Sequence, residues 1–197
     1  MTDQLRIVPA NEASADDLEA VFDRGDPTRC RCQWLKVPYA NWRALPVPER
    51  AARLRDQTRC GEPTAERTTG LIAYLDGAPA GWCAVEPRTA YPRLLTAKVP
   101  WVGRQEDRQD KQVWAVTCFV TRAQYRRRGV GRALAGAAVD FARARGARAV
   151  EGYPITADAG TNAERYVGTE SMFADAGFVA VSRPSDRRVV MRFDLDS

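Results

Sequence analysis

The sequence of 197 residues contains no histidine, and only three of its thirty basic residues are lysines. Histidine is the side chain that most often moves protons near neutral pH, so proton abstraction by this protein must fall to a carboxylate or to water. The same absence removes the mixed cysteine and histidine sets that commonly bind zinc. A preference for arginine over lysine, with abundant alanine, is common in GC-rich bacterial genomes, and we expect a bacterial source.

The sequence also lacks long hydrophobic runs. No stretch approaches the roughly eighteen uncharged apolar residues that span a bilayer, and the first residues carry no apolar segment of a secretion signal. We therefore expect a cytoplasmic protein without membrane contacts. Five cysteines are an odd number for such a chain, so free thiols are expected. Cys30, Cys32 and Cys60 fit no common zinc spacing, and no metal is expected.

The net charge of +5 is concentrated in one part of the chain. Between Arg122 and Arg148 stand eight arginines and a single acidic residue, Asp140. Such a stretch favours the binding of an anion. One alternative is a basic nucleic-acid-binding module. Because the arginines gather at one loop and its following helix rather than over several elements, we expect no nucleic acid partner.

Hydrophobic periodicity, turn residues and helix caps define an order of elements along the chain. They predict strands at residues 5–8, 71–75, 80–85, 113–120, 149–153, 178–181 and 189–193, and helices after Ser14, from Pro48 to Gly61, over 130–146 and over 166–176. The segments 26–46 and 87–112 are predicted to be irregular, with the second bordering the substrate site. The order predicts an α+β fold in which helices flank a single mixed, mostly antiparallel central sheet, within one domain over residues 1–197.

The segment from Gln124 to Arg132 follows the uncharged strand at 113–120 and opens an amphipathic helix. The N-terminus of a helix presents unpaired N–H groups and a partial positive charge, and glycines allow a phosphate to approach the backbone closely. The arginines in this segment add charge-assisted contacts. A solvated turn would account for the glycines and arginines taken alone, but the strand before and the helix after favour a phosphate-binding loop.

The sequence Arg126-x-x-Gly129-x-Gly131 matches the pyrophosphate loop of the GCN5-related N-acetyltransferase (GNAT) family, Arg/Gln-x-x-Gly-x-Gly/Ala. A Gly-Phe pair, Gly177 and Phe178, also follows a predicted helix as it does in that family, so the chain resembles the family over residues 5–193. The resemblance implies a GNAT-like acyl-CoA acyltransferase fold. Residues 113–178 would bind acetyl-CoA as co-substrate, and residues 1–70 would supply helices on the acceptor side.

The resemblance also implies that the strand at 113–120 splays from its neighbour and leaves backbone groups free for the pantetheine arm and the thioester carbonyl. An N–H group aimed at the carbonyl oxygen would stabilise the charge that develops there. The residues implied to contact the co-substrate are Cys118, Phe119, Val120, Arg126, Arg127, Arg128, Gly129, Val130, Gly131 and Arg132.

The activity implied is direct transfer of an acetyl group to a primary amine of a small molecule or, as a second choice, of a protein. Cys118 could be taken for an acyl-carrying nucleophile, but without a histidine to activate it a structural cysteine is favoured. Another alternative is a non-catalytic acyl-CoA sensor. A monomer and a homodimer are both compatible with the sequence.

The catalytic residues follow less directly from the resemblance. Many family members have a tyrosine four residues before the Gly-Phe pair, positioned to protonate the departing thiolate, and this chain has Phe173 there. Tyr166, Tyr153 or Ser171 must then act as the general acid, or solvent must. For the general base the candidates are Glu86 and Glu151, each of which closes a predicted strand. We predict Glu151, because a charge between Val150 and Gly152 is unusual in a buried strand.

Six aromatic residues lie in the segments predicted to cover the acceptor side: Trp34, Tyr39, Trp42, Trp82, Tyr91 and Trp101. Most should serve packing, and the others could line a pocket for a partly apolar amine.

Overall fold

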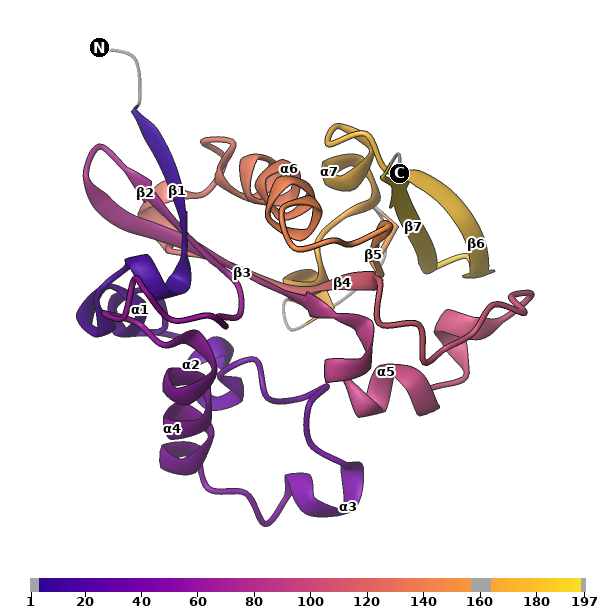
Figure 1. Cartoon of the computed structure of the whole chain (residues 1–197), viewed down its shortest axis with the longest axis horizontal. Helices are drawn as coiled ribbons and strands as arrows, with labels where there is room; N and C mark the ends of the chain where they lie inside the picture. Colours follow the sequence, from indigo (N-terminus) through magenta and orange to yellow (C-terminus); the bar gives the residue numbers. More distant parts are fainter. Residues whose placement is uncertain (1–3, 157–163, 196–197) are drawn as a thin grey trace.

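The computed structural model describes residues 4–156 and 164–195, and its central feature is one mixed sheet of seven strands (Figure 1). The order of strands across the sheet is β1-β2-β3-β4-β5-β7-β6. Their bounds are β1 Leu5–Pro9, β2 Leu71–Leu75, β3 Ala78–Pro87, β4 Val113–Thr121, β5 Ala149–Gly152, β6 Val179–Ser185 and β7 Arg188–Asp194. Every neighbouring pair is antiparallel except β4 and β5. The predicted α+β fold with a mostly antiparallel sheet is confirmed.

The parallel pair of β4 and β5 needs a crossover connection, which helix α6 (Val130–Arg143) provides. Its apolar residues recur at helical spacing, and Val130, Leu134, Ala138 and Phe141 are buried against the sheet. Gly129 precedes the helix with φ 78°, a left-handed conformation that glycine adopts without steric cost. The loop and the helix that it opens therefore lie where the sequence predicts them.

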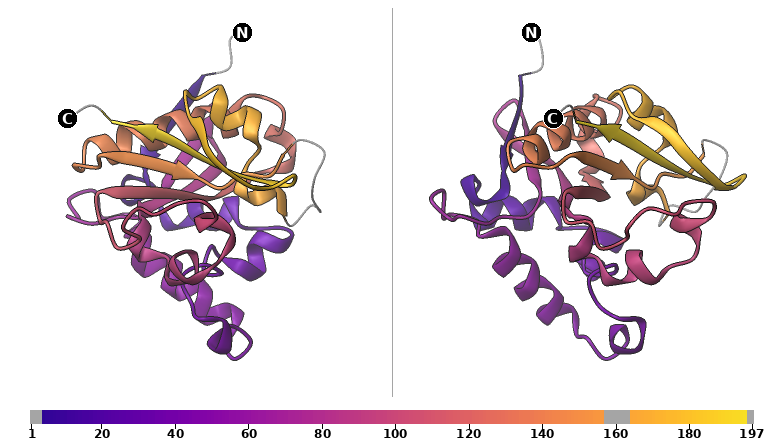
Figure 2. Two further views of the ribbon diagram at one scale, coloured as in Figure 1. Left: turned by 90° about the vertical axis from the view of Figure 1, so that its right-hand side faces the viewer. Right: turned by 45° about the vertical axis from the view of Figure 1, so that its right-hand side comes forward.

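Helices cover both faces of the sheet (Figure 2). On one face α6 and α7 (Glu170–Ala174) pack against Leu71, Val85 and Val116. On the other face α1 (Ala15–Val21) packs against Ile72 and Trp82. The same side carries α2 (Asp26–Cys30), α3 (Tyr39–Trp42), α4 (Val47–Thr58) and α5 (Pro92–Thr96).

Strand β4 contains a bulge beside its pairing with β3. Ala84 faces Cys118 while its neighbour Val85 faces Val116, so Thr117 is an extra residue in β4. A bulge interrupts the alternation of side chains across a strand. Val116 and Phe119 both pack on the α6 face, which leaves Thr117 and Cys118, adjacent in sequence, for the opposite face.

Three segments differ from the sequence-based prediction. Residues 26–46 contain the short helices α2 and α3, and residues 87–112 contain α5 with two single-turn helices, Arg88–Ala90 and Val99–Trp101. The helix predicted over 166–176 is divided into a 3-10 turn, Glu164–Val167, and α7. Gly168 takes φ 86° between them and Thr169 caps α7 by accepting a hydrogen bond from Met172 N (3.3 Å), so the second helix has its own start.

In the described ranges 4–156 and 164–195, no helix has the length and apolar character needed to cross a membrane.

Candidate functional site

The glycine-rich loop ends at an open helix terminus. A Cβ added to Gly129 would have no heavy atom within 4 Å, and no described side chain caps the first N–H groups of α6. The helix start is therefore open at Gly129, as a phosphate site requires, while Met172 lies beside Gly131, where an added Cβ would come within 3.0 Å of its Sδ. Val130 is buried, so only its backbone can contribute to such a site.

The four arginines of the loop surround this terminus. Arg128 forms an ion pair with Asp76 (3.2 Å) in the β2–β3 turn, and Arg132 lies 3.5 Å from Asp175 of α7. Arg126 donates a hydrogen bond to the carbonyl of Thr121 (3.4 Å), and both Arg126 and Arg127 are exposed. The structure thus brings the predicted segment from Arg126 to Arg132 together around one helix start, where it suits a pyrophosphate.

Strands β4 and β5 stop pairing before β4 ends. Their pairing runs from Val113 with Ala149 to Val116 with Gly152, and β4 then continues to Thr121 paired only with β3. The β5-facing edge of residues 117–121 therefore has no strand partner among the described residues. This is the splayed edge that the resemblance implies near Cys118, Phe119 and Val120.

Two cavities lie beside this edge and share part of their lining. The smaller, of about 200 Å³, lies along the loop and is lined by Val120, Arg122, Gln124 and Arg126, among others. The larger, of about 690 Å³, extends beneath the sheet and is lined by Thr117 and Cys118 together with residues of α2, α3, α5 and β7. Pro27 and Tyr166 line both cavities.

Tyr166 therefore lies between the cavity beside the loop and the larger cavity. Its pKa is raised, first by burial and then by the negative charge of Asp26, while Arg126 opposes the shift. The phenol stays protonated at neutral pH and can donate its proton.

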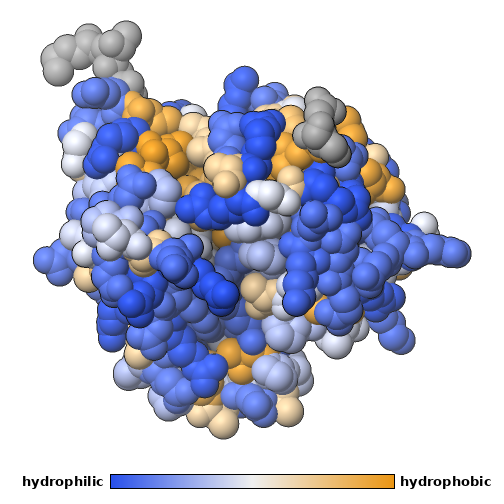
Figure 3. All heavy atoms as spheres, in the orientation of Figure 1, coloured by the Kyte–Doolittle hydropathy of each residue, from blue (hydrophilic) through white to orange (hydrophobic). Residues whose placement is uncertain are grey.

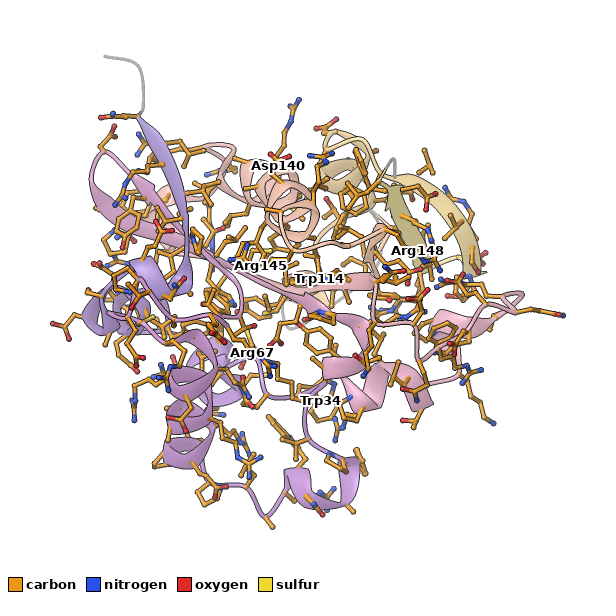
Figure 4. The ribbon with its side chains drawn as sticks, viewed as in Figure 1. Trp34, Arg67, Trp114, Asp140, Arg145 and Arg148 are labelled. Carbon is orange, nitrogen blue, oxygen red and sulfur yellow. The ribbon has the colours of Figure 1, made fainter. Side chains whose placement is uncertain are left out.

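The walls of the larger cavity are mostly apolar. Trp34 and Trp42 pack edge to face with ring centroids 5.1 Å apart, and Leu94, Val99 and Pro100 come from the segment 87–112. Figure 4 shows Trp34 between α3 and α5, and Figure 3 shows apolar residues at the bottom of the hollow that α3, α4 and α5 surround. The prediction that the segment 87–112 borders this site agrees with the geometry.

The six aromatic residues predicted to cover the acceptor side differ in their burial. Trp82, Tyr91 and Trp101 are buried, which leaves Trp34 and Trp42 on the cavity wall and Tyr39 exposed. Three of the six are thus buried in the protein interior, fewer than the sequence-based prediction assigned to packing.

Glu151, predicted as the general base, lines neither cavity. It is fully buried, and its carboxylate accepts hydrogen bonds from Arg88 (3.2 Å), Arg192 (3.2 Å), Arg104 and the hydroxyl of Tyr153 (2.7 Å). An ionised carboxylate has about four acceptor positions, and these three guanidinium groups and the phenol occupy them, which leaves none for the proton of a substrate. This geometry argues against Glu151 as the general base and favours a structural role, in which the charge in β5 balances an arginine cluster.

The remaining acid and base candidates are also engaged elsewhere. Tyr153 touches the larger cavity but donates its proton to Glu151, and burial and that carboxylate raise its pKa well above the ordinary value. Ser171 is exposed on α7 with its hydroxyl 3.2 Å from that of Thr169. Glu86 forms an ion pair with Lys36. Neither Ser171 nor Glu86 lines a cavity, so Tyr166 is the candidate best placed by the structure.

Phe173, which occupies the position of the family's tyrosine, lies in the core. It is fully buried, packs against Phe119 (centroids 5.7 Å apart) and Phe178 (5.0 Å), and presses on Gly152, where an added Cβ would come within 2.3 Å of its ring. Phe173 therefore acts as a packing residue here.

The cysteines lie partly at the site. Cys30, Cys32 and Cys118 line the larger cavity, and all five cysteines of the chain are free. A hydrogen bond with Cys32, then burial, raises the pKa of Cys118 well above its usual range, so the thiolate needed for nucleophilic attack is disfavoured. Among residues 4–156 and 164–195, no group of three or more His, Cys, Asp or Glu side chains is arranged to hold a metal ion.

Sequence reasoning missed Asp26. It is the only carboxylate among the described residues that line the larger cavity, and it stands at the start of α2. Gly25-Asp26-Pro27 signals a helix start, but nothing in that pattern connects it with Tyr166, which is 140 positions further along the chain.

Comparisons with known proteins agree with this geometry. The model of the acetyltransferase (GNAT) family matches residues 32–166. A solved GCN5-related N-acetyltransferase from Kribbella flavida is similar over 97% of this chain and 98% of its own, with 20% identity and a TM-score of 0.55. A ribosomal-protein-alanine N-acetyltransferase from Brucella melitensis is similar over 98% of this chain and 99% of its own, with 16% identity and a TM-score of 0.53.

A GNAT-family acetyltransferase from Streptococcus pneumoniae has the same TM-score of 0.53 with 15% identity, over 98% of this chain and 100% of its own. At these identities the likeness concerns the fold. No curated protein sequence matches the chain. Since the family model spans well over half of the chain and the sheet, loop and splayed strand agree with it, the chain belongs to the GNAT family of acetyltransferases.

Proposed function

We propose that the protein transfers an acetyl group from acetyl-CoA directly to a primary amine of a small molecule. The observation that carries this proposal is the junction of the two cavities at Tyr166, beside the unpaired edge of β4. One cavity lies beside the phosphate-binding loop, lined by residues 120–124 and by Arg126, and the other offers a separate space for an acceptor. A site for acyl transfer needs both spaces and a single point of contact between them.

The chain's own residues would hold the donor as follows. The N-terminus of α6 and the arginines of the loop, with Gly129 giving open access, suit the pyrophosphate. The smaller cavity along Val120 suits the pantetheine arm, whose amides can pair with the free edge of β4. With the donor bound in this way, the thioester of acetyl-CoA would lie next to the backbone of Thr117 and Cys118.

The chemistry needs little from the protein beyond placement and proton transfer. A thioester supplies an acetyl group that is already activated. The acceptor ammonium first gives one proton to water, because only a neutral amine has a free lone pair. Its nitrogen then forms a bond to the carbonyl carbon, the carbon–sulfur bond breaks, the nitrogen loses a second proton and the leaving sulfur gains one. Tyr166 is protonated and lies at the junction, so we assign it the proton that the sulfur gains, while the nitrogen gives its second proton to solvent water.

The size of the acceptor space supports a small molecule. A volume of about 690 Å³ lies within the range of about 300–1,000 Å³ typical of small-molecule pockets.

The test is calorimetric binding of acetyl-CoA to the wild type and to Gly129→Trp. The tryptophan side chain would fill the open space at the start of α6, so micromolar binding by the wild type should be lost in the variant. Gly146→Trp is the matched control, because Gly146 also has a positive φ (76°) and an open Cβ position but lies beyond the other end of α6. Absence of binding to the wild type, or equal binding by both variants, would overturn the proposal. Binding without turnover of any amine would instead indicate the acyl-CoA sensor.

A further inference from the structure

The larger cavity has few charged side chains in its lining. Asp26 is the one described carboxylate there, and Arg188 is the one described guanidinium. Arg188 already has an interaction partner. An amine that enters such a cavity as an ammonium ion loses water, and an unpaired charge in apolar surroundings is costly. Asp26 is therefore the group that can receive an ammonium.

The position of Asp26 places it close to the reacting end of the cavity. A Cβ added to its neighbour Gly25 would lie 3.8 Å from the hydroxyl of Tyr166, so the start of α2 stands beside that phenol. The negative charge of Asp26 also contributes to the raised pKa of Tyr166. Asp26 is exposed rather than locked in an ion pair with a described residue, and its carboxylate can turn towards a ligand.

The apolar walls of the larger cavity favour a ligand whose remaining part is apolar. Arg93 stacks over Trp34 (3.7 Å from guanidinium carbon to ring centroid), and Arg50 stacks over Trp42 (3.8 Å). These contacts help to fix both indole rings, and neither arginine lines the cavity, so the wall is formed before a ligand arrives. Leu94 is buried next to this wall and adds to the apolar surface.

We propose that the acceptor is a primary amine with an apolar, uncharged body, whose ammonium is bound by Asp26 and whose body packs on Trp34, Trp42 and Leu94. The word acceptor rests on the proposed function, acetyl transfer, whereas binding of the amine in this cavity can be tested without acetyl transfer. Polyamines do not fit, because their additional ammonium group would have no carboxylate to pair with in the cavity. Amino acids do not fit, because their own carboxylate would lie close to Asp26.

The experiment uses 2-phenylethylamine as the probe, with spermidine and phenylalanine as the charged alternatives. Release of the CoA thiol at saturating acetyl-CoA gives kcat and KM for each amine, and calorimetry gives the affinity of 2-phenylethylamine without acetyl-CoA. The variants are Asp26→Asn and a control with the same charge change, Asp56→Asn, on an exposed position of α4 outside both cavities.

We expect 2-phenylethylamine to have the highest kcat/KM of the three. Asp26→Asn should raise its KM and its dissociation constant about tenfold to a hundredfold, the loss expected for a hydrogen bond to a charged group. The KM of acetyl-CoA should not change, and Asp56→Asn should match the wild type. A preference for spermidine or phenylalanine, or an unchanged dissociation constant in Asp26→Asn, overturns the inference.

The two proposals fail in different ways. If 2-phenylethylamine binds in an Asp26-dependent manner but is not acetylated, the inference about the pocket stands and the proposed function does not. If acetyl-CoA binds and a charged amine is the substrate, the proposed function stands and the inference does not.

Discussion

Replacing Glu151 by glutamine separates a structural role from a catalytic one. The carboxylate is fully buried and accepts hydrogen bonds from three guanidinium groups and one phenol. Glutamine has nearly the same shape, but it removes the negative charge and turns an N–H₂ donor towards arginine donors. The variant leaves Arg88, also fully buried, without its Glu151 partner, although Glu106 remains 3.3 Å away.

Breaking one partner of a buried ion cluster typically costs about 3–5 kcal/mol. For a protein of this size each kcal/mol lowers the melting temperature by about 2–4 °C, so we expect a loss of about 6–20 °C. The measurement is thermal unfolding followed by circular dichroism. As a control, Glu49→Gln removes an exposed pair with Arg53 (2.7 Å) and should change the melting temperature by no more than about 2–4 °C.

The pH–rate profile of the folded variant completes the test. Because Glu151 lines neither cavity, we expect the shape of the profile to match that of the wild type at a temperature where both are folded. A melting temperature within about 2 °C of the wild type, together with loss of the basic limb of the profile, would refute this reasoning and restore Glu151 as the base.

Two further predictions concern protons. Tyr166→Phe should lower kcat about tenfold to a hundredfold with little change in the KM of acetyl-CoA, because only the proton for the leaving sulfur is lost; steady-state kinetics with unchanged kcat would exclude Tyr166 as the general acid. Stability should also fall in acid. Burial opposes ionisation of Glu106 and of Asp110, but hydrogen bonds from Arg104 and from Arg148 outweigh it, and both pKa values are lowered. A depressed carboxyl pKa contributes stability above the unfolded-state pKa and loses it as the pH falls through the folded value, so unfolding by denaturant should become easier below about pH 4.5. A flat dependence of the unfolding free energy between pH 6 and pH 3 would contradict this.

The parts of the fold that the sequence could predict have local causes. The uncharged, β-branched run at 113–120 predicts a buried strand, and Gly129 marks a helix start with open space beside it. The phosphate side of the site follows from these two signals. A local signal was also present for the break after Tyr166, where Gly168 and the capping Thr169 end one helix and begin another.

The parts that could not be predicted depend on contacts between distant segments. The partners of Glu151 come from positions 88, 104 and 192, and no spacing in the sequence connects them. A charge inside a strand is equally compatible with a catalytic base and with an ion cluster, and only the arrangement of the arginines decides. Asp26 presents the same difficulty, because its importance comes from Tyr166 and from the bulge in β4 rather than from its neighbours in the chain.

The bulge at Thr117 gives two adjacent side chains to the larger cavity, while Trp34, Trp42 and Leu94 of its apolar wall come from segments 26–42 and 94–100, outside the sheet. Apart from Pro27 and Tyr166, which line both cavities, much of the acceptor wall is therefore encoded outside the donor-binding strand and loop. Substitutions in the wall segments can alter which amine fits without disturbing the pairing of β4 with β3 or the start of α6. This division makes the scaffold suited to divergence, in nature or by directed evolution, towards new acceptors with the transfer chemistry retained.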